Sequence, residues 1–323
     1  MKVLITGSTG FIGNHLVRRL AANEHQVRVL VRSLLKFDDI PVEVVCGDIA
    51  MADSLAGICK GVDVVFHLAG ILGQWGKSEQ VYWDINVKGT ENILRECLNS
   101  GVKRFIYCST AGVVGPTNGK LMDESYPYNP SNIYEKTKCE AEKMVREFYS
   151  KYGLPIVVIR PEFIYGPGDM HVLGLFRAIK KGIFPIIGGG RSTLHPTYID
   201  DLISGFELGM KIDNAMGNTY FIAGEEVVSV KRLAEAMAKA MGVSLPQIYL
   251  PEWVTRAGAS ILEPVAKVLN IESPLNHAKI NFFTQPRGVS ILKARKELGY
   301  NPQVGLEEGL KKTVEWYQSQ GYL

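Results

Sequence analysis

The first thirty-two residues constrain the fold of this chain more than any other stretch. An apolar run, Met1–Ile5, leads into glycines spaced three apart at Gly7, Gly10 and Gly13, and a second apolar run ends at Arg32. The order of strand, glycine turn, helix and strand is that of the first βαβ unit of a nucleotide-binding sheet. The pattern therefore predicts a dinucleotide site, the alternative being a glycine-rich turn that binds nothing.

Each glycine in this loop has its own physical reason. Gly7 permits the tight turn after the strand, and Gly10 lets the backbone approach a pyrophosphate without a Cβ in the way. Gly13 lets the helix lie close to the strand, so that the N–H groups at the helix start face the phosphates. The residues that we expect to touch the dinucleotide here are Gly7, Thr9, Gly10, Phe11, Ile12 and Gly13.

The end of the second strand bears on the choice of cofactor. An enzyme selective for NAD usually places an acidic residue at this point, to hold the ribose hydroxyls, whereas this chain has Arg32. A positive charge suits a 2′-phosphate, and Lys36 could add to it. We therefore favour NADP(H), with NAD(H) possible, and the alternative for Arg32 is a solvated side chain at a strand end.

Short apolar runs continue to alternate with helical periods, as a parallel sheet requires. The fold class is therefore α/β, a Rossmann-type doubly wound parallel sheet. The pattern predicts further strands at Val42–Cys46, Val62–Ala69, Arg104–Cys108 and Ile156–Ile159, and helices to about Asn23 and over Glu79–Asn99 and Ser131–Lys151.

Beyond Pro161 the regular alternation fades and glycines and prolines cluster. We expect residues 1–165 to form the dinucleotide-binding domain. Residues 166–323 would form a smaller, partly interleaved substrate lobe, with some segments returning to the sheet. Helical patterns in this half lie at Val172–Lys181, Asp200–Met210, Val230–Met241, Trp253–Leu269 and Leu306–Gln318.

Composition narrows the function classes. The net charge is +3 and no Lys/Arg-rich run occurs, which argues against nucleic acid as a partner. The five cysteines lack metal-like spacing and read as reduced thiols of a cytoplasmic protein, and no metal is expected. No signal peptide is expected, because Met1–Ile5 is needed as a strand, and no uncharged apolar run approaches the ~18 residues of a membrane span.

The pattern Tyr134-x-x-x-Lys138 supplies a candidate acid–base pair. Residues four apart on a helix share one face, and a neighbouring ammonium favours the phenolate of a tyrosine, whose ordinary pKa is about 10. Ser109 and Thr110 follow a strand, at the edge where open α/β sheets bind ligands, and either hydroxyl could donate to the same substrate oxygen. The pair alone is weak evidence, and the order of the motifs strengthens it.

Taken together, the motifs resemble those of extended short-chain dehydrogenases/reductases, the NAD(P)-dependent epimerase/dehydratase family. The resemblance runs from Met1 to about Trp316 and implies an enzyme. The matching pieces are Gly7-Ser-Thr-Gly-Phe-Ile-Gly13, Gly47-Asp48-Ile49, His67-Leu-Ala-Gly70, Asn86-Val-Lys-Gly-Thr90, Ser109-Thr-Ala111, Tyr134-Glu-Lys-Thr-Lys138, Arg160-Pro161 and Tyr165-Gly-Pro-Gly168.

The resemblance implies roles for individual residues. Tyr134 would be the general acid/base, Lys138 its electrostatic partner and a ligand of the nicotinamide ribose, and Thr110 would stand where the family usually has serine, with Ser109 as the fallback. Asn86 would either hold a relay water or fix a helix. Further cofactor contacts are implied at Asp48 and Ile49 beside the adenine, Leu68, Ala69 and Gly70 beneath the cofactor, and Pro161 at the carboxamide.

Departures from the family pattern favour one branch. Ala111-Gly112 replaces the Asp-Glu pair of sugar-nucleotide 4,6-dehydratases, and Leu194 stands where epimerases usually have a diphosphate-binding arginine, with Arg191 three residues earlier. The C-terminal third is more similar to 3β-hydroxysteroid dehydrogenase-like and dihydroflavonol reductase-like enzymes. An apolar substrate pocket could then include Trp253, Ile261, Leu262, Val265, Phe282 and Phe283, unless these are ordinary core residues.

The hypothesis from the sequence is an NADP(H)-dependent oxidoreductase that interconverts a hydroxyl and a carbonyl on a small, largely apolar substrate. The alternatives are a nucleotide-sugar epimerase with tightly bound NAD and a dinucleotide-binding protein without catalysis. A homodimer is expected from the resemblance alone. Glu162, a charged residue directly after Pro161, has no role in this scheme.

Overall fold

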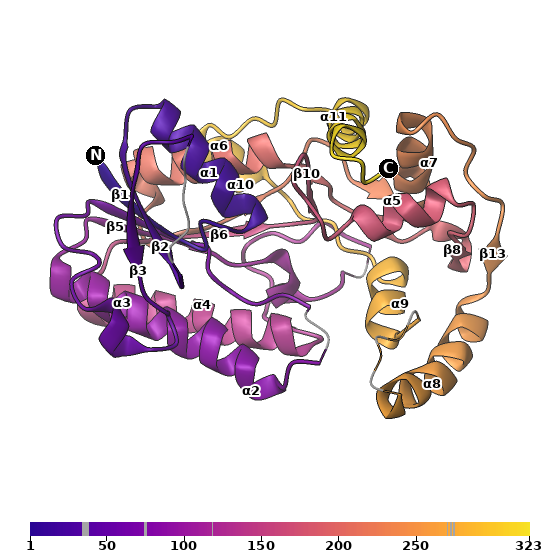
Figure 1. Cartoon of the computed structure of the whole chain (residues 1–323), viewed down its shortest axis with the longest axis horizontal. Coiled ribbons are helices and arrows are strands. Elements are labelled where there is room, and N and C mark those ends of the chain that lie inside the picture. The colour runs from indigo at the N-terminus through magenta and orange to yellow at the C-terminus, as the bar shows by residue number, and fades with distance from the viewer. Residues whose placement is uncertain (34–38, 74–75, 118, 270, 272, 274) are drawn as a thin grey trace.

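A computed structural model gives the fold for residues 1–33, 39–73, 76–117, 119–269, 271, 273 and 275–323; Lys36 lies outside them. A seven-stranded sheet forms the larger half of the molecule (Figure 1). All its strands are parallel, in the order β11-β6-β5-β4-β1-β2-β3. Their bounds are β1 Lys2–Thr6, β2 Gln26–Val31, β3 Val42–Cys46, β4 Val64–His67, β5 Arg104–Cys108, β6 Ile156–Pro161 and β11 Thr219–Ile222.

The strand order reverses its direction between β1 and β4. From β1 the chain first runs outward through β2 and β3, and it then returns to the other side of β1 to add β4, β5 and β6. Thr6 and His67 are register partners at the carboxyl ends of β1 and β4. A doubly wound sheet binds its ligand in the crevice at such a switch point. The predicted fold class is confirmed.

Helices cover both faces of the sheet (Figure 1). Contacts join α1 to α6 on one face and α3 to α4 on the other. Two buried apolar clusters accompany these layers, and they share no buried residue. The bounds of these helices are α1 Phe11–Ala22, α3 Gly89–Ser100, α4 Ile133–Tyr152 and α6 Ile199–Lys211.

The predicted single helix over Glu79–Asn99 is continuous but irregular. It begins as the short helix α2, Glu79–Tyr82, widens into a π-helical turn over Trp83–Lys88, and continues as α3. A π turn inside an α-helix often marks a functional site. Here it contains Asn86, a buried residue of the family motif.

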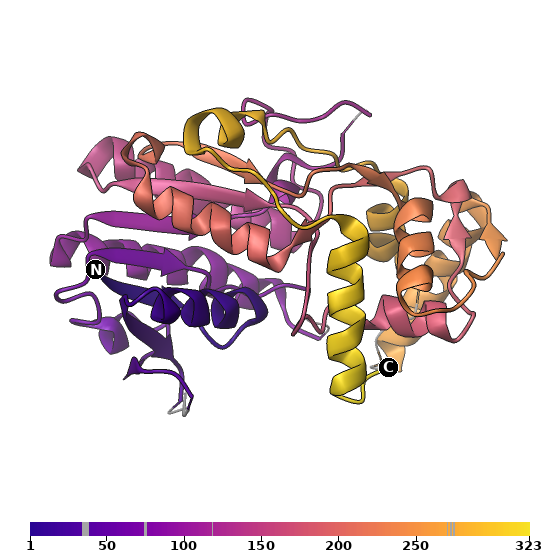
Figure 2. The same ribbon diagram turned by 90° about the horizontal axis from the view of Figure 1, so that it is seen from above.

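The remaining elements build the smaller lobe, which Figure 2 shows beside the sheet with α11 lying between the two parts. Its core continues the apolar cluster that contains β1 and α1. Short two-stranded pairs join β7 to β10, β9 to β12 and β8 to β13. The helices are α5 Leu173–Lys180, α7 Val230–Ala240, α8 Glu252–Val268, α9 His277–Thr284, α10 Leu292–Leu298 and α11 Leu306–Ser319, and the short strands are β7 Ile164–Tyr165, β8 Ile186–Ile187, β9 Thr193–Leu194, β10 Thr197–Tyr198, β12 Val228–Ser229 and β13 Tyr249–Leu250.

β11 returns from the second half of the chain and adds the last strand beside β6. The division into residues 1–165 and 166–323 remains a prediction. All five cysteines are free thiols. Within the described ranges, no helix is long and apolar enough to cross a membrane.

Candidate active site

The glycine loop forms a cradle in which side chains would not fit. A Cβ on Gly7, whose φ is 72°, would lie 2.7 Å from Ala69 N, and a Cβ on Gly13 would lie 2.1 Å from Gly7 O. Helix α1 begins after Gly10 without a side-chain cap, so its first N–H groups remain available. Exposed backbone N–H groups at a helix start bind phosphates, and the cradle therefore fits a dinucleotide pyrophosphate.

The other predicted cofactor residues surround this cradle at the carboxyl edge of the sheet. Arg32 is exposed directly after β2, and Gly70 is exposed after β4. Asp48 caps its own turn, since Ala50 N donates to Asp48 Oδ1 at 2.9 Å. The remaining members of the set, partly or fully buried, are Ile49, Leu68, Ala69 and Pro161.

Tyr134 and Thr110 meet on this same side of the sheet. Tyr134 lies in the first turn of α4 and is partly exposed, while Thr110 follows β5. Burial raises the pKa of the Tyr134 phenol well above its ordinary value, the Cys108 thiol adds to the rise, and a hydrogen bond from Thr110 opposes it. The two hydroxyls therefore lie within reach of a common substrate oxygen.

Lys138 lies one turn further along α4 and is buried. Its ammonium donates to Cys108 O at 2.6 Å and lies 4.2 Å from the centre of the Tyr107 ring. Burial lowers the pKa of Lys138 to about 8. The pKa of Tyr134 is raised in this structure, whereas the sequence analysis expected the neighbouring ammonium to lower it. The raised pKa follows from the desolvation of the ring.

Ser109 has a structural partner instead of facing the site. Its hydroxyl donates to Glu142 Oε2 at 2.5 Å. Arg160 donates to the same carboxylate from Nε, at 3.2 and 3.0 Å, and from Nη2, at 2.5 Å. Tyr128 also donates to Glu142 at 2.9 Å. This buried network ties the ends of β5 and β6 to α4. The sequence analysis missed Glu142, although it lies four residues after Lys138 and therefore on the same helix face.

Asn86 and His67 are both occupied within the protein. The Asn86 amide holds the loop at Ile71, accepting from Ile71 N at 2.8 Å, and donates to Thr137 Oγ1 on α4 at 3.0 Å. His67 lies between two hydroxyls, with Nδ1 2.8 Å from Thr6 Oγ1 and Nε2 3.0 Å from Thr90 Oγ1. Burial lowers the pKa of His67 to about 3, so this histidine is a neutral core residue.

A second charged group lies beside Tyr134, and sequence reasoning did not find it. Arg287, from the segment after α9, donates to Glu135 Oε1 at 2.8 Å, and both side chains are buried. Glu162 completes the group, because Arg287 and Glu135 both act on its pKa. No motif marks Arg287 in the sequence, since more than one hundred residues separate it from both carboxylates.

The predicted apolar pocket is not formed as expected. Trp253, Ile261 and Val265 on α8 are 73%, 68% and 50% exposed, and Leu262 is 40% exposed. Because α8 packs mainly on α9, these side chains face solvent instead of lining a pocket. Phe282 and Phe283 on α9 are partly buried, and Phe282 contacts Phe163, the residue after Glu162, with ring centres 5.8 Å apart.

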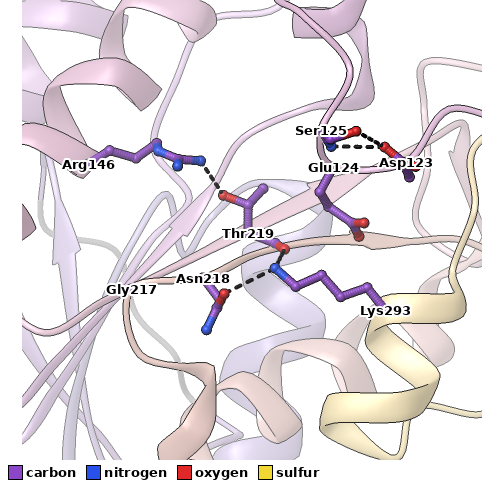
Figure 3. Close-up of a pocket in the computed structure, with 8 residues that line it drawn as sticks. All are labelled: Asp123, Glu124, Ser125, Arg146, Gly217, Asn218, Thr219 and Lys293. Atoms are coloured by element: carbon purple, nitrogen blue, oxygen red, sulfur yellow. Dashed lines mark hydrogen bonds between the residues drawn. The ribbon is translucent and has the colours of Figure 1, made fainter.

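A polar cavity of about 440 Å³ lies elsewhere (Figure 3). It surrounds the amino end of β11, opposite the strand ends that carry Thr110 and Pro161. Arg146 donates to Thr219 Oγ1 at 3.2 Å and Lys293 donates to Thr219 O at 3.2 Å. These two cations of the cavity therefore form hydrogen bonds with β11, the edge strand of the sheet. Among the described residues, no cluster of His, Cys, Asp or Glu could hold a metal ion.

Comparison with known proteins identifies the family. The sequence model described as "NAD dependent epimerase/dehydratase family" matches residues 3–243, most of the chain. The chain belongs to this family. The resemblance inferred from the motifs is therefore confirmed, and the epimerase/dehydratase match covers the glycine cradle, Thr110 and the Tyr134/Lys138 pair.

Relatives of this epimerase/dehydratase family member carry out different reactions. The chain is 32% identical to a 3 beta-hydroxysteroid dehydrogenase/Delta 5-->4-isomerase of Mycobacterium tuberculosis, covering 98% of this chain and 90% of the relative. It is also 32% identical to a 2-alkyl-3-oxoalkanoate reductase of Stenotrophomonas maltophilia, covering 97% and 98%. The UDP-glucuronic acid 4-epimerase of Bacillus cereus, solved with NAD, is similar at 26% identity and a TM-score of 0.80 over 100% of both chains.

These similarities extend over nearly the whole chain. This epimerase/dehydratase family member is therefore an NAD(P)-dependent enzyme of the extended short-chain dehydrogenase/reductase type. The choice between reductase, dehydrogenase and epimerase depends on the site residues.

Proposed function

We propose that the protein is an NADP(H)-dependent oxidoreductase that interconverts a hydroxyl and a carbonyl on a largely apolar substrate. The positions of Thr110, directly after β5, and of Tyr134, in the first turn of α4, on the edge of the sheet that holds the glycine cradle, carry this proposal. The relatives named for a hydroxysteroid and for a 2-alkyl-3-oxoalkanoate support it, because both names describe an alcohol or ketone on a carbon skeleton.

The residues would divide the chemistry as follows. A bound nicotinamide cofactor supplies or accepts the hydride. Tyr134 Oη gives a proton to the carbonyl oxygen in reduction and takes it from the hydroxyl in oxidation, while Thr110 Oγ1 holds the same oxygen. Lys138 keeps a positive charge beneath the site and reaches the nicotinamide ribose. Arg32, exposed after β2, holds the 2′-phosphate of NADP(H).

Replacing Tyr134 tests this function directly. Tyr134→Phe should lower kcat by about 10²- to 10⁴-fold, since general acid catalysis contributes on that order. The measurement follows NADPH oxidation with a 3-ketosteroid and with a 2-alkyl-3-oxoalkanoate, and NADPH binding by fluorescence should change little. A variant with undiminished turnover would remove Tyr134 from the chemistry, and a wild type inactive with both ketones would refute the function.

A nucleotide-sugar epimerase is the second candidate, favoured by the structural likeness to the UDP-glucuronic acid 4-epimerase. One observation weighs against it: Leu194, which stands where epimerases usually have a diphosphate-binding arginine, is fully buried in β9. Exposed Arg191 is the remaining candidate to grip a diphosphate. Native mass spectrometry should then find retained NAD, and Arg191→Asp should weaken binding of UDP-glucuronic acid.

The same measurement reports the assembly. We propose a homodimer formed through α4 and the helix that contains α3, the two helices that the family resemblance marks as the interface. A mass of twice the chain would support this, and a single chain mass at micromolar concentration would contradict it.

A further inference from the structure

One segment runs from the expected nicotinamide end of the site into the substrate lobe. It begins at Pro161, the last residue of β6, and ends at Gly168, in the loop that leads to α5. Its middle is held in place, because β7 pairs with β10 and the Thr197 hydroxyl donates to the Glu162 carbonyl. The family resemblance places Pro161 at the carboxamide, so the contacts at the far end influence how the lobe meets a bound cofactor.

The far end of this segment packs against helix α1. His15 Nε2 lies 2.7 Å from Pro167 O, and the imidazole N–H is the donor because a carbonyl oxygen only accepts. The ring of Phe11 packs edge-on against His15, with ring centres 5.4 Å apart. A Cβ placed on Gly168 would lie 3.7 Å from His15 Nε2 and 3.7 Å from Phe11 Cδ2, so the loop backbone lies directly against both rings.

Phe11 and His15 belong to the same helix as the pyrophosphate cradle. Phe11 directly follows Gly10, and His15 lies one turn further along α1 on the same face. The helix whose start would bind the phosphates therefore also holds the end of the segment that enters the substrate lobe.

The lobe side of the loop is anchored as well. Asp169 N donates to Gly166 O at 3.2 Å and closes the turn, and the Tyr317 hydroxyl on α11 donates to the Asp169 carbonyl. Gly168 has a φ of 91°, which residues with a side chain rarely adopt. The loop is thus held between α1 and α11, with the His15 hydrogen bond joining it to the dinucleotide-binding side.

We propose that His15 is a positioning residue, which fixes the loop at Pro167 against α1 and thereby aligns the substrate lobe with a bound dinucleotide. The inference rests on the proposed function where ketone reduction is the readout. His15 transfers neither hydride nor proton, because it acts through the loop. A misplacement of about 1 Å between reacting groups can lower a rate by about 100-fold, so such a contact can govern kcat from outside the reacting atoms.

Steady-state kinetics with matched variants test this role. His15→Leu removes the donor and should lower kcat for the 3-ketosteroid or the 2-alkyl-3-oxoalkanoate by about 10- to 100-fold. NADPH affinity, measured by fluorescence, should change little, because the glycine cradle stays intact. His15→Gln should recover most of the rate, since its amide nitrogen can donate from nearly the same place as Nε2. His25→Leu is the control, because it removes a histidine beyond the other end of α1.

Amide hydrogen exchange tests the contact without a ketone. NADPH should slow exchange across residues 164–170 of the wild type by about tenfold or more, and His15→Leu should lose most of this protection. Wild-type exchange in this segment that does not respond to NADPH would overturn the inference, and this result needs no variant. Equal protection in His15→Leu would overturn it too.

The kinetic outcomes separate positioning from other roles. An unchanged kcat in His15→Leu would overturn the inference, as would parallel losses of kcat and NADPH affinity, which would assign the histidine to the cradle itself. A His15→Gln variant as slow as His15→Leu would show that the donor is not what matters. A wild type inactive with both ketones would refute the proposed function instead, and the exchange experiment would still decide the role of His15.

Discussion

Tyr134, Lys138 and Glu142 follow one another at intervals of four residues on one face of α4. One helical turn is enough to separate a candidate catalytic position from a structural one. Tyr134 is partly exposed beside Thr110, Lys138 is buried against Cys108, and Glu142 is fully buried with Arg160. Exposure falls along the face as the helix descends over the sheet. The residue nearest the carboxyl ends of the strands can therefore reach a ligand, while the deepest one fixes the strands.

Arg32 should determine the preference between the two cofactors. Arg32→Asp should weaken NADPH binding at least tenfold more than NADH binding, because the charge that holds the 2′-phosphate becomes repulsive. Fluorescence titration of both cofactors measures this. Arg256→Asp on α8 is the matched control, and equal losses for the two cofactors in Arg32→Asp would assign the arginine a structural role.

His67 should make the fold sensitive to acid. Its folded-state pKa is lowered to about 3, so between pH 6.5 and 3 the unfolded chain binds a proton that the folded chain does not. This histidine therefore lowers the free energy of unfolding as the pH falls through that range. His67→Gln should show a shallower decline between pH 6.5 and 4 in urea denaturation, and parallel curves would contradict this account.

Residues with a local signal were predictable from the sequence. The glycine loop and the Tyr134/Lys138 spacing each follow from short-range pattern and backbone geometry. Arg287 was not predictable, because its partner Glu135 is distant in the chain and a lone buried arginine leaves no periodic trace. The choice between Thr110 and Ser109 depended on Glu142, which engages Ser109.

At the scale of elements, the start of α1 depends on the absence of one methyl group. A Cβ on Gly13 would lie 2.1 Å from Gly7 O, so Gly13→Ala must push the helix away from the loop. We expect a loss of about 1 to 3 kcal/mol in the free energy of unfolding and a loss of dinucleotide binding. Gly174→Ala in α5, where the Cβ meets nothing within 4 Å, is the control and should be neutral or slightly stabilising. Retained cofactor affinity in Gly13→Ala would show that the loop tolerates the displacement.

The elements of the first half were predicted within a few residues, since parallel strands buried on both faces read as apolar runs. The exceptions have physical reasons. The π turn over Trp83–Lys88 hardly changes the spacing of apolar residues along the helix. The sequence pattern therefore does not reveal it. β11 is only four residues long. Distant side chains bind the backbone groups on its open edge, as Glu124 does by accepting from Phe221 N at 2.8 Å.

At the scale of the whole molecule, the late segment around Arg287 closes onto the early helix α4. Arg287→Met should lower the free energy of unfolding by about 3 to 5 kcal/mol, because it leaves the Glu135 carboxylate buried without its cation. The double variant with Glu135→Gln should recover much of this loss in a double-mutant cycle followed by urea denaturation. Additive losses would mean that the two side chains do not stabilise each other.

The segment that follows α9 also pairs with the first half through its backbone. Thr117 N donates to Pro286 O at 2.7 Å, and Met122 forms a bridge with Val289. The family match ends at residue 243, and this later segment, through Arg287, reaches Glu135, the residue next to Tyr134 in α4. Consider a chimera that joins the C-terminal segment of one relative to the sheet domain of another. We expect it to be unstable unless the acidic residue that pairs with the arginine, here Glu135 with Arg287, is exchanged as well. A change of substrate range in this family would then require paired substitutions, one in the segment after α9 and one in the part of the first half that it contacts.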